Sequence, residues 1–255
     1  MKYIDSHAHY LARQFNKDRS ELLNKLFNED LSAIIECGTN TASNDKIIKF
    51  IKENKDVYGV IGYFPTDVHE LEDEKTLEHF KSILSDPKIL GIGEIGFDYH
   101  HKSDRSLQRK WFMTQLKLAK TYNLPVCIHS RDAEADTLSV LKNNGKTTGV
   151  IHCYSYGVST MHELDKLGFY FGVGSTCTYL CNKDLRDAIK QMPIEKIVLE
   201  TDAPYLSPVQ KKKERNDSNN IKYVINELAK LKNTTPETII AQTNKNVHSL
   251  YARLP

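Results

Sequence analysis

The sequence predicts an α/β fold, a (β/α)8 barrel of the TIM type, because short apolar strands alternate with helix-patterned segments along the chain. Eight strand candidates lie at 2–8, 32–38, 57–64, 89–97, 125–130, 149–153, 169–174 and 196–202. Amphipathic segments such as 109–122 and 161–168 lie between them. Strands that alternate with helices form parallel β/α units, and about eight such units in about 250 residues fit a closed barrel better than an open sheet.

The composition of the chain allows an ordinary soluble enzyme. No repeat, low-complexity tract or Pro/Gly-rich linker interrupts the pattern, so we expect one domain over residues 1–255. A net charge of +2 with 27% charged residues indicates no obligatory polyanion partner. The five cysteines form no C-x-x-C pair and are expected to be buried free thiols in a reducing compartment. We find no membrane-spanning run, signal-peptide core or mark of an obligate protein partner, and expect a cytoplasmic protein.

The first strand carries the segment DSHAH. Alternate residues of a strand point to the same face, so Asp5, His7 and His9 share one side. Two imidazoles on one strand are either half of a metal site or two polar residues near the end of a sheet. The choice depends on whether further ligands follow other strands.

Ligand-type side chains do follow other strands, at the end where a barrel opens. The carboxyl ends of the strands in such a barrel surround the active site. An isolated histidine in an apolar strand is more often a buried polar residue than a ligand. Several at the same end of the barrel favour a metal centre instead. The candidate ligands are His7, His9, Glu94, His129, His152 and Asp202.

This set is too large for one open catalytic ion, which usually keeps about three protein ligands. We therefore expect two divalent ions that share Glu94, with His7, His9 and Asp202 on one ion and His129 and His152 on the other. Two ions about 4 Å apart can bind both sides of a scissile phosphodiester and activate a water. Asp202 would accept the proton of that water, and Glu94 and Asp202 are the catalytic candidates. Mixed N/O ligands allow Mg, Mn or Zn.

The motifs DSHAH, GEIGFDY, HSRDA, IHCYSYG and ETDAPYL, in this order, resemble the TatD family of metal-dependent deoxyribonucleases in the amidohydrolase superfamily. The resemblance runs from Asp5 to AQTNKNVHSLY at 241–251. It implies a TIM-type barrel, a divalent-metal centre on the six candidate ligands, and hydrolysis of DNA phosphodiesters, often from an end of the strand.

Two departures from the family pattern stand out. Family members usually have G-x-H-P after the third strand, whereas this chain has GYFP, with Phe64 in the place of the histidine. His69 is a nearby substitute at a different spacing. The family's later Asn-Glu-Pro is Asn216, Asp217 and Ser218 here, which leaves the contacts of that loop open.

Several further residues have two interpretations. Asp5 and Glu200 either orient ligands from behind or are buried polar residues bonded to barrel neighbours. Arg131 suits phosphate, although loop arginines are usually solvated. Asp98 and Tyr99 either position substrate or only end their strand. The basic run KKKER, from Lys211 to Arg215, suits a DNA backbone or is a solvated face.

The sequence thus predicts a divalent-metal-dependent hydrolase that cleaves DNA phosphodiesters through a metal-activated water, with RNA as a further polymer. The alternative enzyme is an ester or amide hydrolase, for example on aminoacylated RNA, that uses the same centre. A third reading is a non-catalytic nucleic-acid binder, which would not require six intact ligands. Cys153 follows His152 and is expected from strand alternation to point into the core rather than act as a nucleophile.

Overall fold

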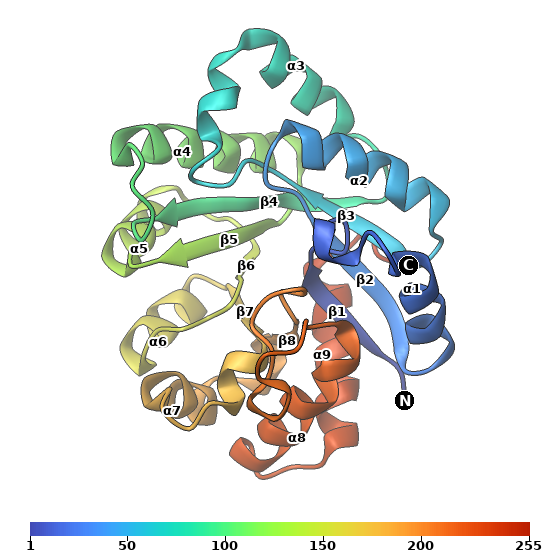
Figure 1. Ribbon diagram of the computed structural model, residues 1–255. Helices are drawn as coiled ribbons and strands as arrows, with labels where there is room; N and C mark the ends of the chain where they lie inside the picture. The colour runs from blue at the N-terminus through green and yellow to red at the C-terminus, as the bar shows by residue number, and fades with distance from the viewer.

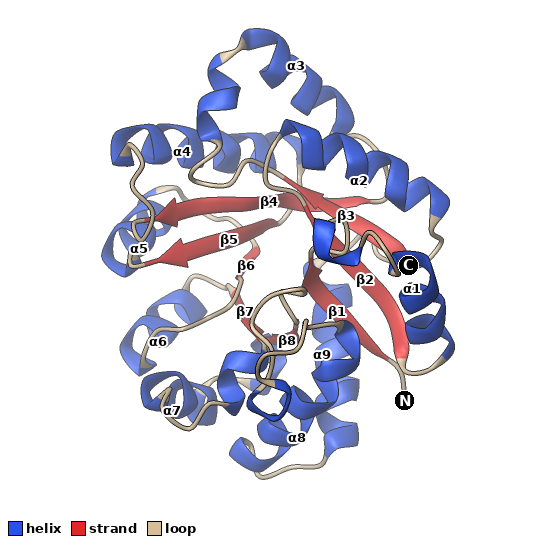
Figure 2. Ribbon diagram, viewed as in Figure 1, coloured by secondary structure: helices blue, strands red, loops and turns tan.

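Eight parallel strands form one sheet in the order of the chain, surrounded by helices (Figures 1 and 2). The computed structural model describes residues 1–255. The strands are β1 (Tyr3–Ala8), β2 (Leu31–Cys37), β3 (Val57–Ile61), β4 (Ile89–Asp98), β5 (Val126–Arg131), β6 (Gly149–Ile151), β7 (Tyr170–Val173) and β8 (Ile197–Leu199). The predicted (β/α)8 architecture is confirmed.

The barrel closes where β1 meets the segment after β8. Ala8 forms a parallel bridge with Ala203. The amide of His9 donates to the carbonyl of Ala203 at 2.7 Å, and the amide of Asp202 donates to the carbonyl of His7 at 3.0 Å. Closure therefore fixes three candidate ligands relative to one another through the backbone alone.

A helix follows each strand. They are α1 (Arg19–Asn28), α2 (Thr41–Glu53), α3 (Glu74–Ile83), α4 (Arg105–Tyr122), α5 (Glu134–Asn143), α6 (Val158–Lys166), α7 (Lys183–Gln191) and α8 (Ile221–Leu231), with α9 (Pro236–Leu250) as an addition. Local sequence explains their starts. Asn40 and Ser43 form a capping box on α2, and Asp104 accepts from the first amides of α4. None of the helices is both long and apolar enough to cross a bilayer.

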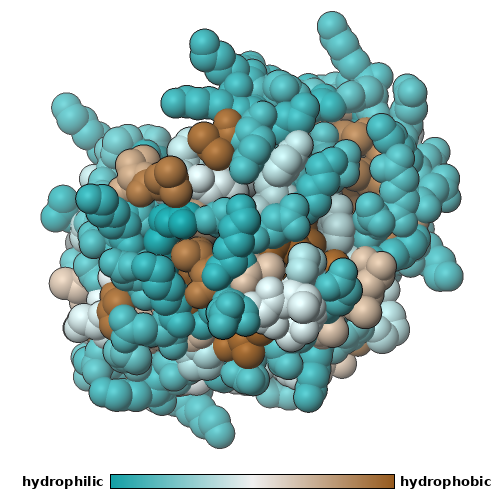
Figure 3. Space-filling model, turned by 90° about the horizontal axis from the view of Figure 1, so that it is seen from below, coloured by the Kyte–Doolittle hydropathy of each residue, from teal (hydrophilic) through white to brown (hydrophobic).

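The core has two parts. The larger lies between the strands and the surrounding helices. The smaller fills the barrel interior, where Ile4, Leu90 and Val198 pack against Val247 and Leu250 of α9. Because Ile4 and Leu90 lie near the amino ends of their strands, α9 covers the bottom of the barrel and leaves the carboxyl ends open. The face seen from below in Figure 3 is mostly hydrophilic, with separate hydrophobic residues.

Three strands end two or three residues earlier than their apolar runs predict. β3 ends at Ile61, β6 at Ile151 and β8 at Leu199, so Phe64, His152 and Asp202 belong to the loops beyond. The backbone turns at these points, where Cys153 and Asp202 have φ of 46° and 57°. An apolar run indicates that residues are buried, not that they belong to a strand. Around the mouth of a barrel, buried residues continue into the loops after the strand hydrogen bonds have ended.

The contact of α9 with the barrel interior can be tested at Leu250, whose exposure is only 3%. We expect Leu250→Ala to lower the free energy of unfolding by roughly 2–5 kcal/mol, because it opens a cavity at the barrel bottom. The exposed Lys245→Ala on the same helix should change it by less than about 0.5 kcal/mol. Denaturant unfolding measures both. An equal effect of the two variants would contradict this role of α9.

Candidate metal centre

A cavity of about 1130 Å³ opens at the carboxyl ends of the strands. Five of the six predicted ligands line it: His9, Glu94, His129, His152 and Asp202. His7 lies directly beneath, 1% exposed, with its ring stacked on that of His152 at 3.6 Å between centroids. The structure therefore brings all six predicted ligands together.

The first set of ligand atoms surrounds one point at the end of β1. Nε2 of His7 and Nε2 of His9 lie 3.1 Å apart. Oδ1 of Asp202 lies 3.6 Å from the His7 nitrogen and 3.3 Å from that of His9. Oε2 of Glu94 lies 3.5 Å and 3.7 Å from the same two nitrogens. Four ligand atoms from β1, β4 and the loop after β8 thus converge.

The other oxygen of Glu94 faces the opposite side. Oε1 of Glu94 lies 2.7 Å from Nδ1 of His129 and 3.7 Å from Nε2 of His152. The single carboxylate therefore separates the two imidazoles at the end of β1 from His129 in β5 and His152 after β6. This is the arrangement expected of a residue that two ions share.

Charge in the centre is strongly coupled. Burial by itself would raise the pKa of Glu94, but the charge of His152 and hydrogen bonds with His129 and His7 hold it well below its ordinary value. Burial also opposes ionisation of Asp202, yet its hydrogen bond with His9 and the charge of His152 lower that pKa. Both carboxyl groups are therefore ionised near neutral pH. The imidazoles attract protons in return, and a bound cation would displace those protons.

The first set fits a divalent cation. Four ligand atoms about 2.1 Å from one ion at tetrahedral angles lie about 3.4 Å apart. The two imidazole nitrogens lie 3.1 Å from each other and 3.3 to 3.7 Å from the two carboxylate oxygens. A hydrogen bond between the two nitrogens would stabilise this arrangement little, whereas one cation bound by both nitrogens would stabilise it well. The donor set of nitrogen and oxygen suits Zn, Mn or Mg.

Comparisons with known proteins identify the family of the chain. The sequence profile of the family described as TatD related DNase matches residues 4–252. The chain belongs to the TatD family. The resemblance predicted from the motifs is thus confirmed, and the chain is a metal-dependent hydrolase of that family.

Relatives match nearly the full chain. The Bacillus subtilis protein YabD, an uncharacterized metal-dependent hydrolase, is 32% identical over 251 residues, which are 97% of this chain and 98% of YabD. A Citrobacter koseri protein named 3'-5' ssDNA/RNA exonuclease TatD is 28% identical over 97% of this chain and 98% of its own. The crystal structure of YjjV, a TatD homolog from Escherichia coli K12, matches with a TM-score of 0.90 at 27% identity, covering 99% and 98% of the two chains.

Two further carboxylates within the TatD-family motifs contact the histidines of the centre. Oε1 of Glu200 lies 3.2 Å from Nδ1 of His152 and accepts the amide of Cys153 at 2.6 Å. Oδ2 of Asp98 lies 3.2 Å from Nε2 of His129. The sequence left Asp98 as a substrate contact or as the end of its strand, and the contact with His129 was not expected. Its place four residues after Glu94 at the end of β4 was the available signal.

Asp5 accepts from backbone amides and from two hydroxyl groups, and from none of the candidate ligand side chains. It accepts from the amide of His7, and from the amide and hydroxyl of Thr201 at 3.1 Å and 2.6 Å. It also accepts from the hydroxyl of Ser218 at 2.6 Å. The expected alternation fails because the pairing of β1 with β2 shifts register between Asp5 and Ala8. Asp5 therefore ties β1 to the loop that carries Asp202.

Glu36 is a further buried carboxylate that sequence reasoning missed. It accepts from the amides of Tyr10 and Leu11 at 2.7 Å and 2.8 Å, and so fixes the chain just after His9. Burial raises its pKa to about 7, against the charge of His9 and the two amides. The only sequence signal for Glu36 was that a charged residue stands within a hydrophobic run.

Of the predicted substrate-binding residues, only Arg131 lines the cavity. Tyr99 turns away, with its hydroxyl 2.6 Å from Asp136. Lys211 pairs with Glu214 at 3.1 Å, and Arg215 pairs with Asp18 at 2.6 Å. The basic run therefore lies outside the cavity lining, with its first and last cations already paired.

The two departures from the family pattern have clear structural counterparts. Phe64 lines the cavity, with its ring 4.6 Å from that of His129, whereas His69 is exposed and lies outside the cavity lining. Asn216 donates to the carbonyls of Thr201 and Tyr205 at 2.9 Å and 2.7 Å. The loop after β8 is thus held although Asp217 and Ser218 follow that asparagine.

The expectation for Cys153 was wrong in its direction. Cys153 lines the cavity, because β6 ends at Ile151 and strand alternation no longer applies. Burial raises the pKa of its thiol to about 12. A neutral thiol is a poor nucleophile, so its place in the cavity does not make it a catalytic candidate.

The contact between Asp98 and His129 predicts a measurable effect on metal affinity. We expect Asp98→Asn to weaken divalent-cation binding by about 10–100-fold, because the histidine loses the anion that fixes its ring. Isothermal titration calorimetry with Mn²⁺ measures this. His101→Ala removes the other imidazole on Asp98, at 2.9 Å, and should leave the affinity unchanged. Equal affinities of Asp98→Asn and the wild type would contradict the role of Asp98.

Proposed function

We propose that this TatD-family hydrolase cleaves phosphodiester bonds of nucleic acids, DNA foremost, and releases residues from a strand end. The observation that carries the proposal is the Glu94 carboxylate, whose two oxygens face separate imidazole sets at the floor of an open cavity. A two-ion site of this kind suits a reaction in which the attacking and leaving oxygens both need stabilisation. The name of the Citrobacter koseri relative, an ssDNA/RNA exonuclease, supports the same substrate class.

The residues divide between two positions for divalent ions. His7, His9 and Asp202 would hold one ion, His129 and His152 the other, and Glu94 would contact both. When bound, such ions polarise the phosphoryl oxygens and make a water acidic enough to attack at neutral pH. Glu200 and Asp98 would keep the rings of His152 and His129 in the orientation that this requires.

Asp202 is suited to take the proton of the attacking water. Its pKa is lowered by His9 and His152 despite burial, so it is an ionised acceptor at neutral pH. Its side chain is 16% exposed, more than that of Glu94 at 5%, and it lines the cavity. A carboxylate at the boundary between ligands and solvent can both face the ion and release a proton to water.

Two cations at the cavity can contact the substrate phosphates. Arg131 follows His129 on β5, and Lys46 lies on α2 at the other side of the lining. Both are exposed and neither forms a salt bridge, unlike Lys211 and Arg215. An unpaired cation loses less on binding phosphate than one that must first leave a carboxylate.

Phe64 is the observation that favours the alternative reaction, hydrolysis of an ester or amide. It places an apolar ring beside His129, where a phosphodiesterase would gain more from a polar group. The same activated water attacks either centre, so only substrates distinguish the two reactions.

The test of the proposal is digestion of end-labelled single- and double-stranded DNA and RNA with Mg²⁺, Mn²⁺ or Zn²⁺. We expect metal-dependent cleavage, and Asp202→Asn to lower kcat by about 10²–10⁴-fold, as for loss of a general base. Asp187→Asn on α7 is the matched control, because its carboxylate is exposed and pairs only with Lys190. The label pattern gives the direction of digestion.

If the metal-loaded wild type leaves every polymer intact, the phosphodiesterase proposal fails. A panel of aryl esters and aminoacylated RNA then tests the carbonyl reaction. Phe64→His should in that case lower ester turnover, because it removes the apolar wall of the cavity.

Salt dependence tests the two cavity cations. We expect Arg131→Ala and Lys46→Ala each to raise KM and to reduce the slope of log affinity against log salt by about 0.7 on a single strand. Lys211→Ala should leave both quantities unchanged, because that lysine pairs with Glu214 outside the cavity. A larger effect of Lys211→Ala than of Arg131→Ala would place the nucleic acid on the basic run instead.

A further inference from the structure

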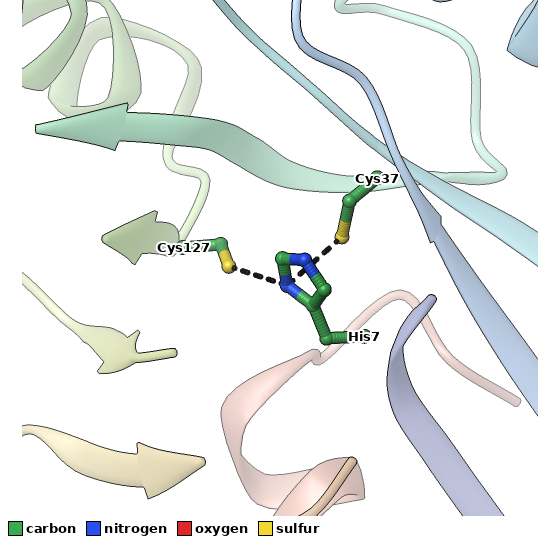
Figure 4. Close-up of side chains that lie close together, drawn as sticks. All are labelled: His7, Cys37 and Cys127. Atoms are coloured by element: carbon green, nitrogen blue, oxygen red, sulfur yellow. Dashed lines mark hydrogen bonds between the residues drawn. The ribbon is translucent and has the colours of Figure 1, made fainter. Parts of the chain in front are cut away.

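A second cluster of potential ligands lies directly beneath the candidate metal centre. Nδ1 of His7 is 3.3 Å from Sγ of Cys127 on β5 and 3.3 Å from Sγ of Cys37 on β2. Figure 4 shows the imidazole between the two thiols. The exposures of these three residues are 1%, 1% and 3%. The cluster uses the nitrogen of His7 that faces away from His9 and Asp202.

The three atoms have the spacing of a soft-metal site. All lie within 4.8 Å of one another. A zinc ion about 2.3 Å from sulfur and about 2.1 Å from nitrogen, at tetrahedral angles, separates those atoms by about 3.5 Å. The nitrogen–sulfur distances of 3.3 Å are close to this value. Both thiols also belong to the apolar barrel interior with Ile35, Val60 and Val198, which holds them in place.

We propose that Cys37, Cys127 and Nδ1 of His7 bind a thiophilic divalent cation of the Zn²⁺ type, at a site separate from the candidate active centre. Sulfur ligands select such ions over Mg²⁺ and Mn²⁺. Binding releases the two thiol protons, and two thiolates balance the charge of one divalent ion. A neutral site of this kind is the one that a buried apolar surrounding tolerates. Cys37 also belongs to the lining of the cavity above.

Occupation of this lower site withdraws His7 from the centre above. A neutral imidazole carries one N–H, so when Nδ1 binds a metal the proton lies on Nε2. That nitrogen then no longer has a lone pair for the ion shared with His9, Glu94 and Asp202. The lower site is thus an inhibitory site for zinc, and this consequence, unlike the binding itself, rests on the proposed function.

Cadmium is the probe for binding, because thiolate ligation gives an ultraviolet charge-transfer band that nitrogen and oxygen ligands do not give. Metal-free protein is first saturated with Mn²⁺, then titrated with Cd²⁺. We expect the band to saturate at one equivalent, and Cys37→Ser and Cys127→Ser each to lose most of it. Cys181→Ser and Cys177→Ser are the controls, one exposed and one buried, and should keep the band. A band that survives Cys37→Ser/Cys127→Ser would overturn the proposal.

A measurement on the wild type covers the case in which the serine variants do not fold. X-ray absorption of protein loaded with Mn²⁺ and one equivalent of Zn²⁺ should show two sulfur atoms at about 2.3 Å from zinc. Only nitrogen and oxygen neighbours would overturn the site.

Activity tests the coupling separately. Zinc should raise the Mn²⁺ concentration for half-maximal turnover by at least about 10–100-fold in the wild type, because losing a ligand weakens metal binding no less than losing the support behind one. The increase should be absent in Cys127→Ser. The cadmium band with no effect of zinc on turnover would reject the coupling and keep the site. The band with no turnover under any condition would reject the proposed function alone.

Discussion

Two backbone hydrogen bonds between β1 and the loop after β8 are the constraint on which the candidate site depends. They join His7 to Asp202 and His9 to Ala203, and they close the barrel at the same time. More than 190 residues of the chain separate the two histidines from the aspartate, yet closure gives them a fixed register. Asp5 reinforces it by accepting from Thr201 and Ser218. The hydrogen bonds between β1 and the loop after β8 therefore form a seam on which both the barrel and the candidate site depend. Weakening this seam would disturb the fold and the positions of the ligands together.

The buried carboxylates near this seam have different functions, which depend on the groups that each one contacts. Glu94 contacts imidazoles on both sides and is held ionised by them. Asp98 and Glu200 lie behind single histidines. Glu36 accepts two backbone amides, and burial raises its pKa, so it supports the chain rather than the charge of the centre. Environment, not residue type, separates these functions.

The fold and the six candidate ligands could be predicted from sequence because both depend on periodic features. The alternation of strands with helices along the chain predicted the barrel. The carboxyl ends of the strands then pointed to His129, His152 and Asp202. Contacts that depend on side-chain direction beyond a strand could not be predicted. Cys153 enters the cavity because its backbone turns at φ of 46°. The register shift in β1 redirects Asp5 to Thr201. Pairing of Lys211 and Arg215 likewise depends on neighbours such as Asp18, which is distant in sequence.

His7 connects the polar mouth of the barrel with its apolar interior, and this position explains its chemistry. Its Nε2 faces His9 and Asp202, while its Nδ1 faces two thiols where a carboxylate or carbonyl usually stands behind a metal-binding histidine. A thiol is a weak hydrogen-bond acceptor but a strong ligand for soft metals once deprotonated. The ring of His7 is therefore held less firmly from behind than the rings of His129 and His152. The presence of two thiols in place of a carboxylate weakens this support and at the same time creates an affinity for zinc.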